Sequence, residues 1–136
     1  MNTPSDVRAL PKVLLHEHLD GSLRVATLFE LLHARGLNCP APDPQALGRW
    51  FDERAHAGSL VDYLRGFDLT VAAMATPAGL ERVAFEAAED ARADGCALAE
   101  FRTAPLLFEP FGLQVDAVVE ALLDGLAGSP LRTGLI

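Results

Sequence analysis

Apolar residues along the chain form three short strand-like runs, separated by longer segments with helical spacing. The run Lys12–Leu19 predicts a buried strand, because Pro11 precedes it and Gly21 follows it. Alternation over Cys96–Thr103 predicts a second strand. The apolar end of residues 133–136 predicts the opening of a third strand. Three strands are therefore expected, each far from the next in the sequence.

The segments between these strands carry helix signals. Apolar residues recur at helical spacing over residues 25–32 and again over residues 115–126. A short helix is expected over Gln45–Arg54, after a proline-rich connector. Ser59-Leu60-Val61-Asp62 has the S-x-x-D pattern of a helix start, and Thr76-Pro77 places proline where a helix loses no hydrogen bond. Two further helices should begin at these positions.

The order strand, helices, strand, helix, strand predicts parallel pairing and an α/β fold. Parallel sheets need helices on both faces or closure into a barrel. A complete eight-stranded barrel needs about 250 residues, whereas this chain has 136. The chain is therefore expected to be either a small open sheet or an incomplete TIM-type (β/α)8 barrel, comprising about the first two to three β/α units, and its end inside an apparent strand favours the incomplete barrel. Residues 1–136 would form the N-terminal part of a single barrel domain.

Composition and charge limit the possible partners. Half of the residues are hydrophobic, which argues against disorder, and the net charge is −8 without a Lys/Arg cluster. This charge argues against binding nucleic acid or an anionic membrane, but it leaves an uncharged nucleoside possible. Cys39 and Cys96 suggest no disulfide framework, so a cytoplasmic location is expected. The first six residues lack a basic-then-apolar leader, and no apolar run approaches the ~20 residues of a membrane span.

The candidate chemistry lies in His16-Glu17-His18-Leu19-Asp20-Gly21. Alternate side chains of a strand share a face, so His16 and His18 should point the same way and Glu17 the opposite way. Two imidazoles side by side supply half of a metal site, because a catalytic zinc normally has three protein ligands and a water. The alternative is a pair of hydrogen-bonded polar residues at the mouth of a strand, without metal.

Other catalytic patterns fit less well. The segment is not H-E-x-x-H, because Asp20 stands at the fifth position and the segment is not helical. Neither cysteine begins the C-x-x-C that cytidine-type deaminases require. The sequence has no Walker A loop, G-x-S-x-G or G-x-G-x-x-G. A metallohydrolase therefore remains the leading class.

Three segments, in order along the chain, resemble the adenosine deaminase family of the metal-dependent amidohydrolase superfamily. The first is Pro11–Ser22, which is similar to the signature that opens the family. The second is Ser59–Asp68, and the third is Glu100–Pro105, which is similar to the family's E-x-R-x-x-P pattern. The resemblance covers nearly the whole chain and is weakest in the proline-rich connector.

The resemblance implies a TIM-type barrel with one Zn²⁺ ion and hydrolytic conversion of adenosine to inosine and ammonia, a step of purine metabolism. It implies that His16 and His18 are metal ligands, that His18 also lies near the nucleoside, and that Asp20 binds a ribose hydroxyl. The helical stripe that would form an apolar lid over the purine is Leu60, Tyr63, Leu64 and Phe67, unless this stripe is ordinary core. The remaining ligands and the general acid are expected beyond residue 136, so no catalytic residue is assigned within the chain.

Three functional classes remain open at this point. The leading one is the N-terminal part of a zinc-dependent adenosine deaminase, a hydrolase acting on a cyclic amidine C–N bond, which is expected to be inactive as these 136 residues alone. The second is a related amidohydrolase that deaminates adenine or a modified adenosine. The third is a truncated fragment without catalysis. The two imidazoles by themselves suit zinc, iron or nickel.

Overall fold

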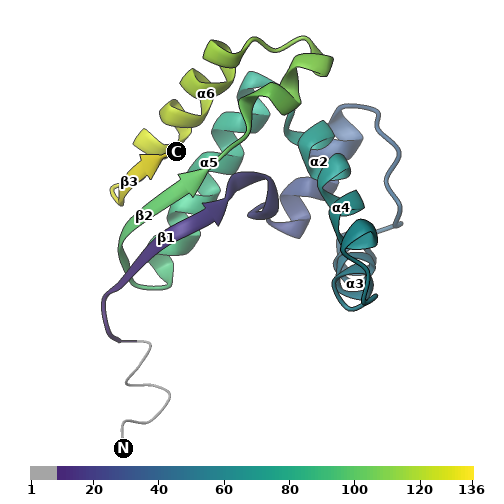
Figure 1. The fold of residues 1–136 in the computed structure, drawn as a ribbon, viewed down its shortest axis with the longest axis horizontal. Coiled ribbons are helices and arrows are strands. Elements are labelled where there is room, and N and C mark those ends of the chain that lie inside the picture. The colour runs from purple at the N-terminus through teal and green to yellow at the C-terminus, as the bar shows by residue number, and fades with distance from the viewer. Residues whose placement is uncertain (1–8) are drawn as a thin grey trace, which may run out of the picture.

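A computed structural model describes residues 9–136, so the absence of a leader expected over the first six residues lies outside the described part. The three strands are β1 (Lys12–His18), β2 (Cys96–Arg102) and β3 (Arg132–Leu135). They form one parallel sheet in the order β1-β2-β3 (Figure 1). The predicted strands and their parallel pairing are therefore confirmed, with ends shifted by one residue.

The helices between the strands begin within one residue of where the sequence signals predicted. Their bounds are α2 (Val25–Ala34), α3 (Pro44–Ala55), α4 (Leu60–Met74), α5 (Pro77–Ala93) and α6 (Val115–Ala127). Short 3₁₀ turns, η1 (Leu19–Gly21) and η2 (Pro105–Phe111), follow the ends of β1 and β2. The hydroxyl of Ser59 accepts from the Asp62 amide at 3.3 Å, and that of Thr76 accepts from the Gly79 amide at 3.0 Å. These caps satisfy amides that the first helical turn leaves free.

The core lies between one face of the sheet and the helices α5 and α6 (Figure 1). Ala99 and Phe101 of β2 point into it and are 0 and 1% exposed. Leu80 of α5 and Leu122 of α6 are also fully buried there. A second, smaller cluster joins α2, α3 and α4 around Leu28, Leu32, Leu47 and Ala73. The chain therefore has a packed helical side and a sheet face that points away from it.

The prediction that β1 is buried is wrong. Val13 and Leu15 are 57 and 55% exposed, and His16 and His18 are exposed as well. Only Leu14 of the apolar run packs against the core. The apolar run suggested that both faces of β1 are packed against other elements. In the structure α5 and α6 cover one face of the sheet, and the β1 side chains on the other face are exposed. β1 also stands at the edge of the three-stranded sheet.

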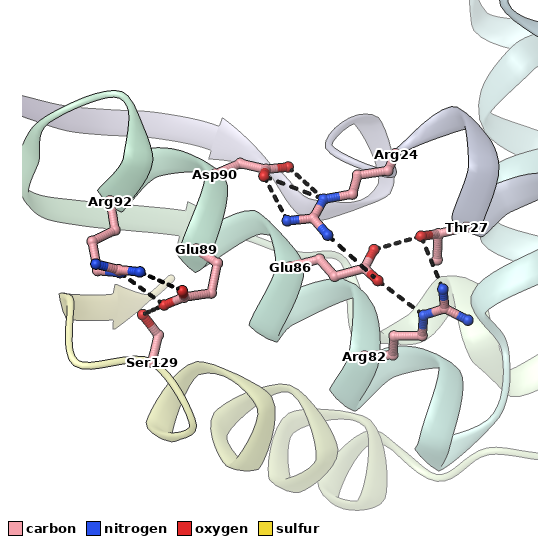
Figure 2. A network of polar contacts seen from close by, with 8 residues as sticks. All are labelled: Arg24, Thr27, Arg82, Glu86, Glu89, Asp90, Arg92 and Ser129. Atoms are coloured by element: carbon pink, nitrogen blue, oxygen red, sulfur yellow. Dashed lines mark hydrogen bonds and ion pairs between the residues drawn. The ribbon is translucent and has the colours of Figure 1, made fainter.

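Polar contacts connect the start of α2 to α5 (Figure 2). The Glu86 carboxylate of α5 accepts from the Thr27 hydroxyl at 2.6 Å and from Arg82 Nε at 2.9 Å. Arg24 donates from Nε and Nη2 to the carboxylate of Asp90. Because Thr27 and Glu86 are buried, this network links the two helices at a defined register.

No helix among residues 9–136 combines the length and the apolar character that crossing a membrane would require.

Candidate functional site

A β-bulge in β1 decides where the two histidines point. Leu14 pairs with Ala99 and Glu17 with Phe101, so three steps along β1 match two along β2. Ala99 and Phe101 face the helices, and paired residues in neighbouring strands share a face. Leu14 and Glu17 therefore both lie on the helical side. Uninterrupted alternation from Leu14 would have placed both histidines there too.

His16, within the bulged segment, and His18, just after it, lie on the open face of the sheet. Their Nε2 atoms are 3.1 Å apart, and the ring centroids are separated by 5.1 Å with a 33° angle between the planes. His18 pairs in register with Arg102, which is on the face opposite Phe101. The expected side-by-side arrangement of the two rings is therefore present, at the carboxyl end of the strand.

The separation of the two nitrogens fits a shared metal ion. A tetrahedral zinc with Zn–N bonds of about 2.05 Å places two imidazole nitrogens about 3.3 Å apart. The observed distance of 3.1 Å is close to this value, and the rings are exposed rather than packed in the core. Over residues 9–136, no group of three or more His, Cys, Asp and Glu side chains could hold an ion. The chain thus supplies two candidate ligands.

The turn η1 carries Asp20 directly after the histidines. Leu19 is 0% exposed and anchors the turn in the core. The amide of Ser22 donates to the Leu19 carbonyl at 3.1 Å and closes the turn. Partial burial raises the pKa of Asp20, while the nearby His18 and a backbone hydrogen bond act in the opposite direction. Asp20 is thus a partly buried carboxyl group, two residues after His18 in the sequence.

A cavity of about 270 Å³ adjoins this turn and is lined by residues of α2, α3 and α4. Its wall combines polar groups from η1 and α3 with aromatic rings from α3 and α4. The residues that define these sides are Asp20, Phe51, Arg54, Tyr63 and Phe67. Its volume and its mixed apolar and polar lining suit a small planar molecule that carries a few hydrogen-bonding groups.

The predicted substrate residues are only partly brought together, and His18 is not part of the cavity lining. Asp20, Tyr63 and Phe67 line the cavity, and the rings of Tyr63 and Phe67 meet edge to face with centroids 5.5 Å apart. Leu60 and Leu64 are 72 and 50% exposed on α4 and are not part of the lining. The apolar stripe on α4 is therefore not ordinary core at these positions.

Sequence reasoning missed the contribution of α3. Phe51 and Arg54 line the cavity, and the Arg54 guanidinium stacks on the Trp50 ring at 3.6 Å. The available signal was the spacing of Leu47 and Phe51, which places both on one side of a helix. Leu47 is fully buried, and Phe51 packs beside it against α2 and α4.

Comparisons with known proteins identify the family of the chain. The family model described as Adenosine deaminase matches residues 11–135. Adenosine deaminase from Mycobacterium tuberculosis H37Rv is 48% identical over 126 residues, which are 92% of this chain and 34% of the relative. Adenosine deaminase from Mycobacterium leprae is 45% identical over 131 residues, or 93% of this chain and 36% of the relative.

Solved structures show the same fold. A zinc-bound amidohydrolase from Burkholderia ambifaria aligns with a TM-score of 0.80 and 25% identity, over 100% of this chain and 38% of that one. An N6-mAMP deaminase from arabidopsis aligns with a TM-score of 0.78 and 25% identity, over 96% of this chain and 41% of that one. The three-stranded sheet is therefore part of a TIM-type barrel, as predicted.

The chain spans about a third of the length of the curated relatives it matches. Its family match extends over nearly all of its own residues, from the strand that carries the histidines to β3. Because the family model covers well over half of the chain, the chain belongs to the adenosine deaminase family.

Proposed function

We propose that the complete protein is a zinc-dependent deaminase that hydrolyses adenosine to inosine and ammonia. The observation that carries this proposal is the pair of Nε2 atoms, 3.1 Å apart, at the carboxyl end of β1, directly before the turn whose Asp20 lines the cavity. This chain would supply the β1–β3 part of a single barrel domain. We also expect the protein to act in the cytoplasm on a small purine nucleoside, with no nucleic acid or membrane as its partner.

His16 and His18 would each donate an imidazole nitrogen to the ion. A bound zinc lowers the pKa of a water molecule, so that hydroxide is available near pH 7. The B. ambifaria neighbour is a zinc-bound amidohydrolase, which supports zinc among the metals that imidazole suits. The other ligands and the general acid would come from outside these 136 residues.

Asp20 and the aromatic side chains would hold the nucleoside. A carboxylate accepts hydrogen bonds from a ribose hydroxyl, and Asp20 lines the cavity. Tyr63 and Phe67 would offer their rings to the purine, while Leu60 and Leu64 would cover it from the exposed side of α4. His18, two residues before Asp20, would also lie near the bound nucleoside.

A second candidate is a deaminase of modified adenosine or of adenine. The N6-mAMP deaminase from arabidopsis, at 25% identity, supports the first of these. The relatives at 45–48% identity that are called adenosine deaminase favour unmodified adenosine. Turnover of adenosine, adenine and N6-methyl-AMP by the complete protein would separate these substrates.

The role of the histidines is tested by His16→Ala and His18→Ala in the complete protein. Both variants should lose bound zinc and deaminase activity, whereas His56→Ala should retain both. His56 is a suitable control because it is exposed directly after α3, and its ring bonds to the Asp52 carbonyl of that helix at 2.7 Å. Full zinc content in His16→Ala or His18→Ala would contradict the proposed metal site.

The 136 residues alone should not turn over adenosine, because they bring together no group of three metal-binding side chains over residues 9–136. Deamination by the purified chain would contradict this part of the proposal. A complete protein that binds zinc but deaminates none of the three substrates would support the non-catalytic alternative.

A further inference from the structure

Glu17 places a carboxylate on the helical side of the sheet, away from the two histidines. It pairs in register with Phe101, which is 1% exposed, and it is itself half-buried. A carboxylate at such a position costs free energy unless it is hydrogen-bonded. Its partner is the Ser22 hydroxyl, whose Oγ lies 2.6 Å from Glu17 Oε1.

Ser22 is connected to the strand and to the turn at once. Its Oγ also lies 2.7 Å from the carbonyl oxygen of His18, so its single proton is shared between two acceptors. Its backbone amide donates to the Leu19 carbonyl. These contacts close a short loop that contains both His18 and Asp20.

The same bonds lie next to an irregularity in the sheet. The bulge between Leu14 and Glu17 interrupts the ladder to β2 and leaves an extra residue of β1 unpaired. The bond from Ser22 to Glu17 ties down the first residue after this interruption.

We propose that Glu17 and Ser22 form a positioning pair, which clamps the bulged end of β1 to the η1 turn and thereby fixes the directions of His18 and Asp20. This inference rests on the proposed function, because it assigns the pair a role toward the metal and the nucleoside. Neither residue touches the ion or the substrate in this role. Partners that orient metal ligands typically change metal affinity by about 10–100-fold when they are removed, and we expect a loss near the lower end of this range.

The test is a titration of the zinc-free complete protein with Co²⁺, followed by the visible absorption of the bound ion. Ser22→Ala and Glu17→Ala should each weaken cobalt binding about tenfold and change the absorption band, because the coordination geometry changes. Ser22→Thr and Glu17→Gln retain the hydroxyl and an acceptor oxygen, and they should bind cobalt much like the parent protein.

Ser129 and Glu89 provide a matched control. Their Oγ and Oε1 atoms are 2.7 Å apart, so Ser129→Ala removes the same kind of bond between α5 and the turn before β3. This variant should lose stability but leave the cobalt affinity and spectrum unchanged. Circular dichroism shows which variants are folded, and Glu17→Ala decides the question if Ser22→Ala does not fold.

The results separate the two ideas. Parent-like cobalt affinity and absorption in Ser22→Ala and Glu17→Ala would overturn the positioning role while leaving the metal site in place. An equal loss in Ser129→Ala would also overturn it, because the effect would then be general destabilisation. A parent protein that binds no cobalt would refute the proposed metal site, and the positioning role with it.

Discussion

Gly125 of α6 lies directly against the Glu81 carbonyl of α5, at the point where these two helices cross. A Cβ atom at position 125 would collide with this carbonyl oxygen and would stand 2.9 Å from the Cβ of Ala84. Such distances leave no room for a side chain, because the neighbouring atoms are backbone atoms of Glu81 and the Cβ of Ala84 rather than the flexible end of a long side chain. The absence of a side chain at Gly125 therefore sets how closely α5 and α6 pack over the sheet.

Gly125→Ala should consequently destabilise the protein, although alanine favours helices more than glycine does. We expect a loss of about 1–3 kcal/mol in the free energy of unfolding, because the helices must separate. Gly48→Ala is the control, since the nearest atoms to its new Cβ would be Val25 methyl groups at 4.0 Å. Urea denaturation should show Gly48→Ala as stable as the parent or more so. Equal midpoints for Gly125→Ala and the parent would contradict the close helix contact.

The buried carboxylate of Glu86 should matter more than the exposed one of Glu30, although both bind Arg82. Glu86 is 9% exposed and also accepts from Thr27, whereas the Glu30 side chain is 60% exposed. Glu86→Ala leaves a buried hydroxyl and two arginines without this partner, so a loss of about 2–3 kcal/mol is expected. Glu30→Ala should change the free energy of unfolding by less than about 1 kcal/mol. A similar loss for both variants, measured by urea denaturation, would argue against the network in Figure 2 as a specific fastening of α2 to α5.

Glu89 should make stability depend on pH in the acidic range. Hydrogen bonds from Arg92, and then from Ser129, lower the pKa of Glu89 from its ordinary value of 4.5 to about 2. Because the folded-state pKa is the lower one, this stabilisation is fully present above pH 4.5 and is lost as the pH falls toward 2. The difference in unfolding free energy between the parent and Glu89→Gln should therefore shrink between about pH 5 and pH 3. A difference that stays constant over this interval would contradict the assignment.

Local signals in the sequence predicted the elements of the fold well. The caps at Ser59 and Thr76 depend on bonds that span three residues, so the sequence contains all the information that they require. The carboxylate half of the first cap is different, because Asp62 bonds to Arg65 at 2.9 Å instead of to the helix start. Short-range patterns thus predicted where helices begin. They did not predict which of several neighbours a polar side chain such as Asp62 would bind.

The face to which the histidines point could not be predicted in this way. Alternation alone places Leu14, His16 and His18 on one face, whereas the structure separates Leu14 from the two histidines. The separation comes from the bulge, which depends on pairing with β2, more than 80 residues later in the chain. The inward position of Phe51 depends in the same way on packing between helices. The metal role of His16 and His18 stays a prediction.

Gly66 offers a direct test of the cavity as the substrate site. Its position on α4 lets the Phe51 ring of α3 approach, and a Cβ there would stand 2.9 Å from Phe51 Cε1. Both residues line the cavity, so Gly66→Leu would displace this ring and fill part of the 270 Å³ space. In the complete protein we expect the KM for adenosine to rise about 10-fold or more, by analogy with the 10–200-fold effect of one methylene in an apolar pocket. The zinc content should not change, because His16 and His18 lie on β1 rather than in this helix pair.

Gly48→Ala, on the same α3 helix as Phe51 but outside the cavity lining, should leave the KM unchanged. An unaltered KM in a folded Gly66→Leu variant would place the nucleoside elsewhere.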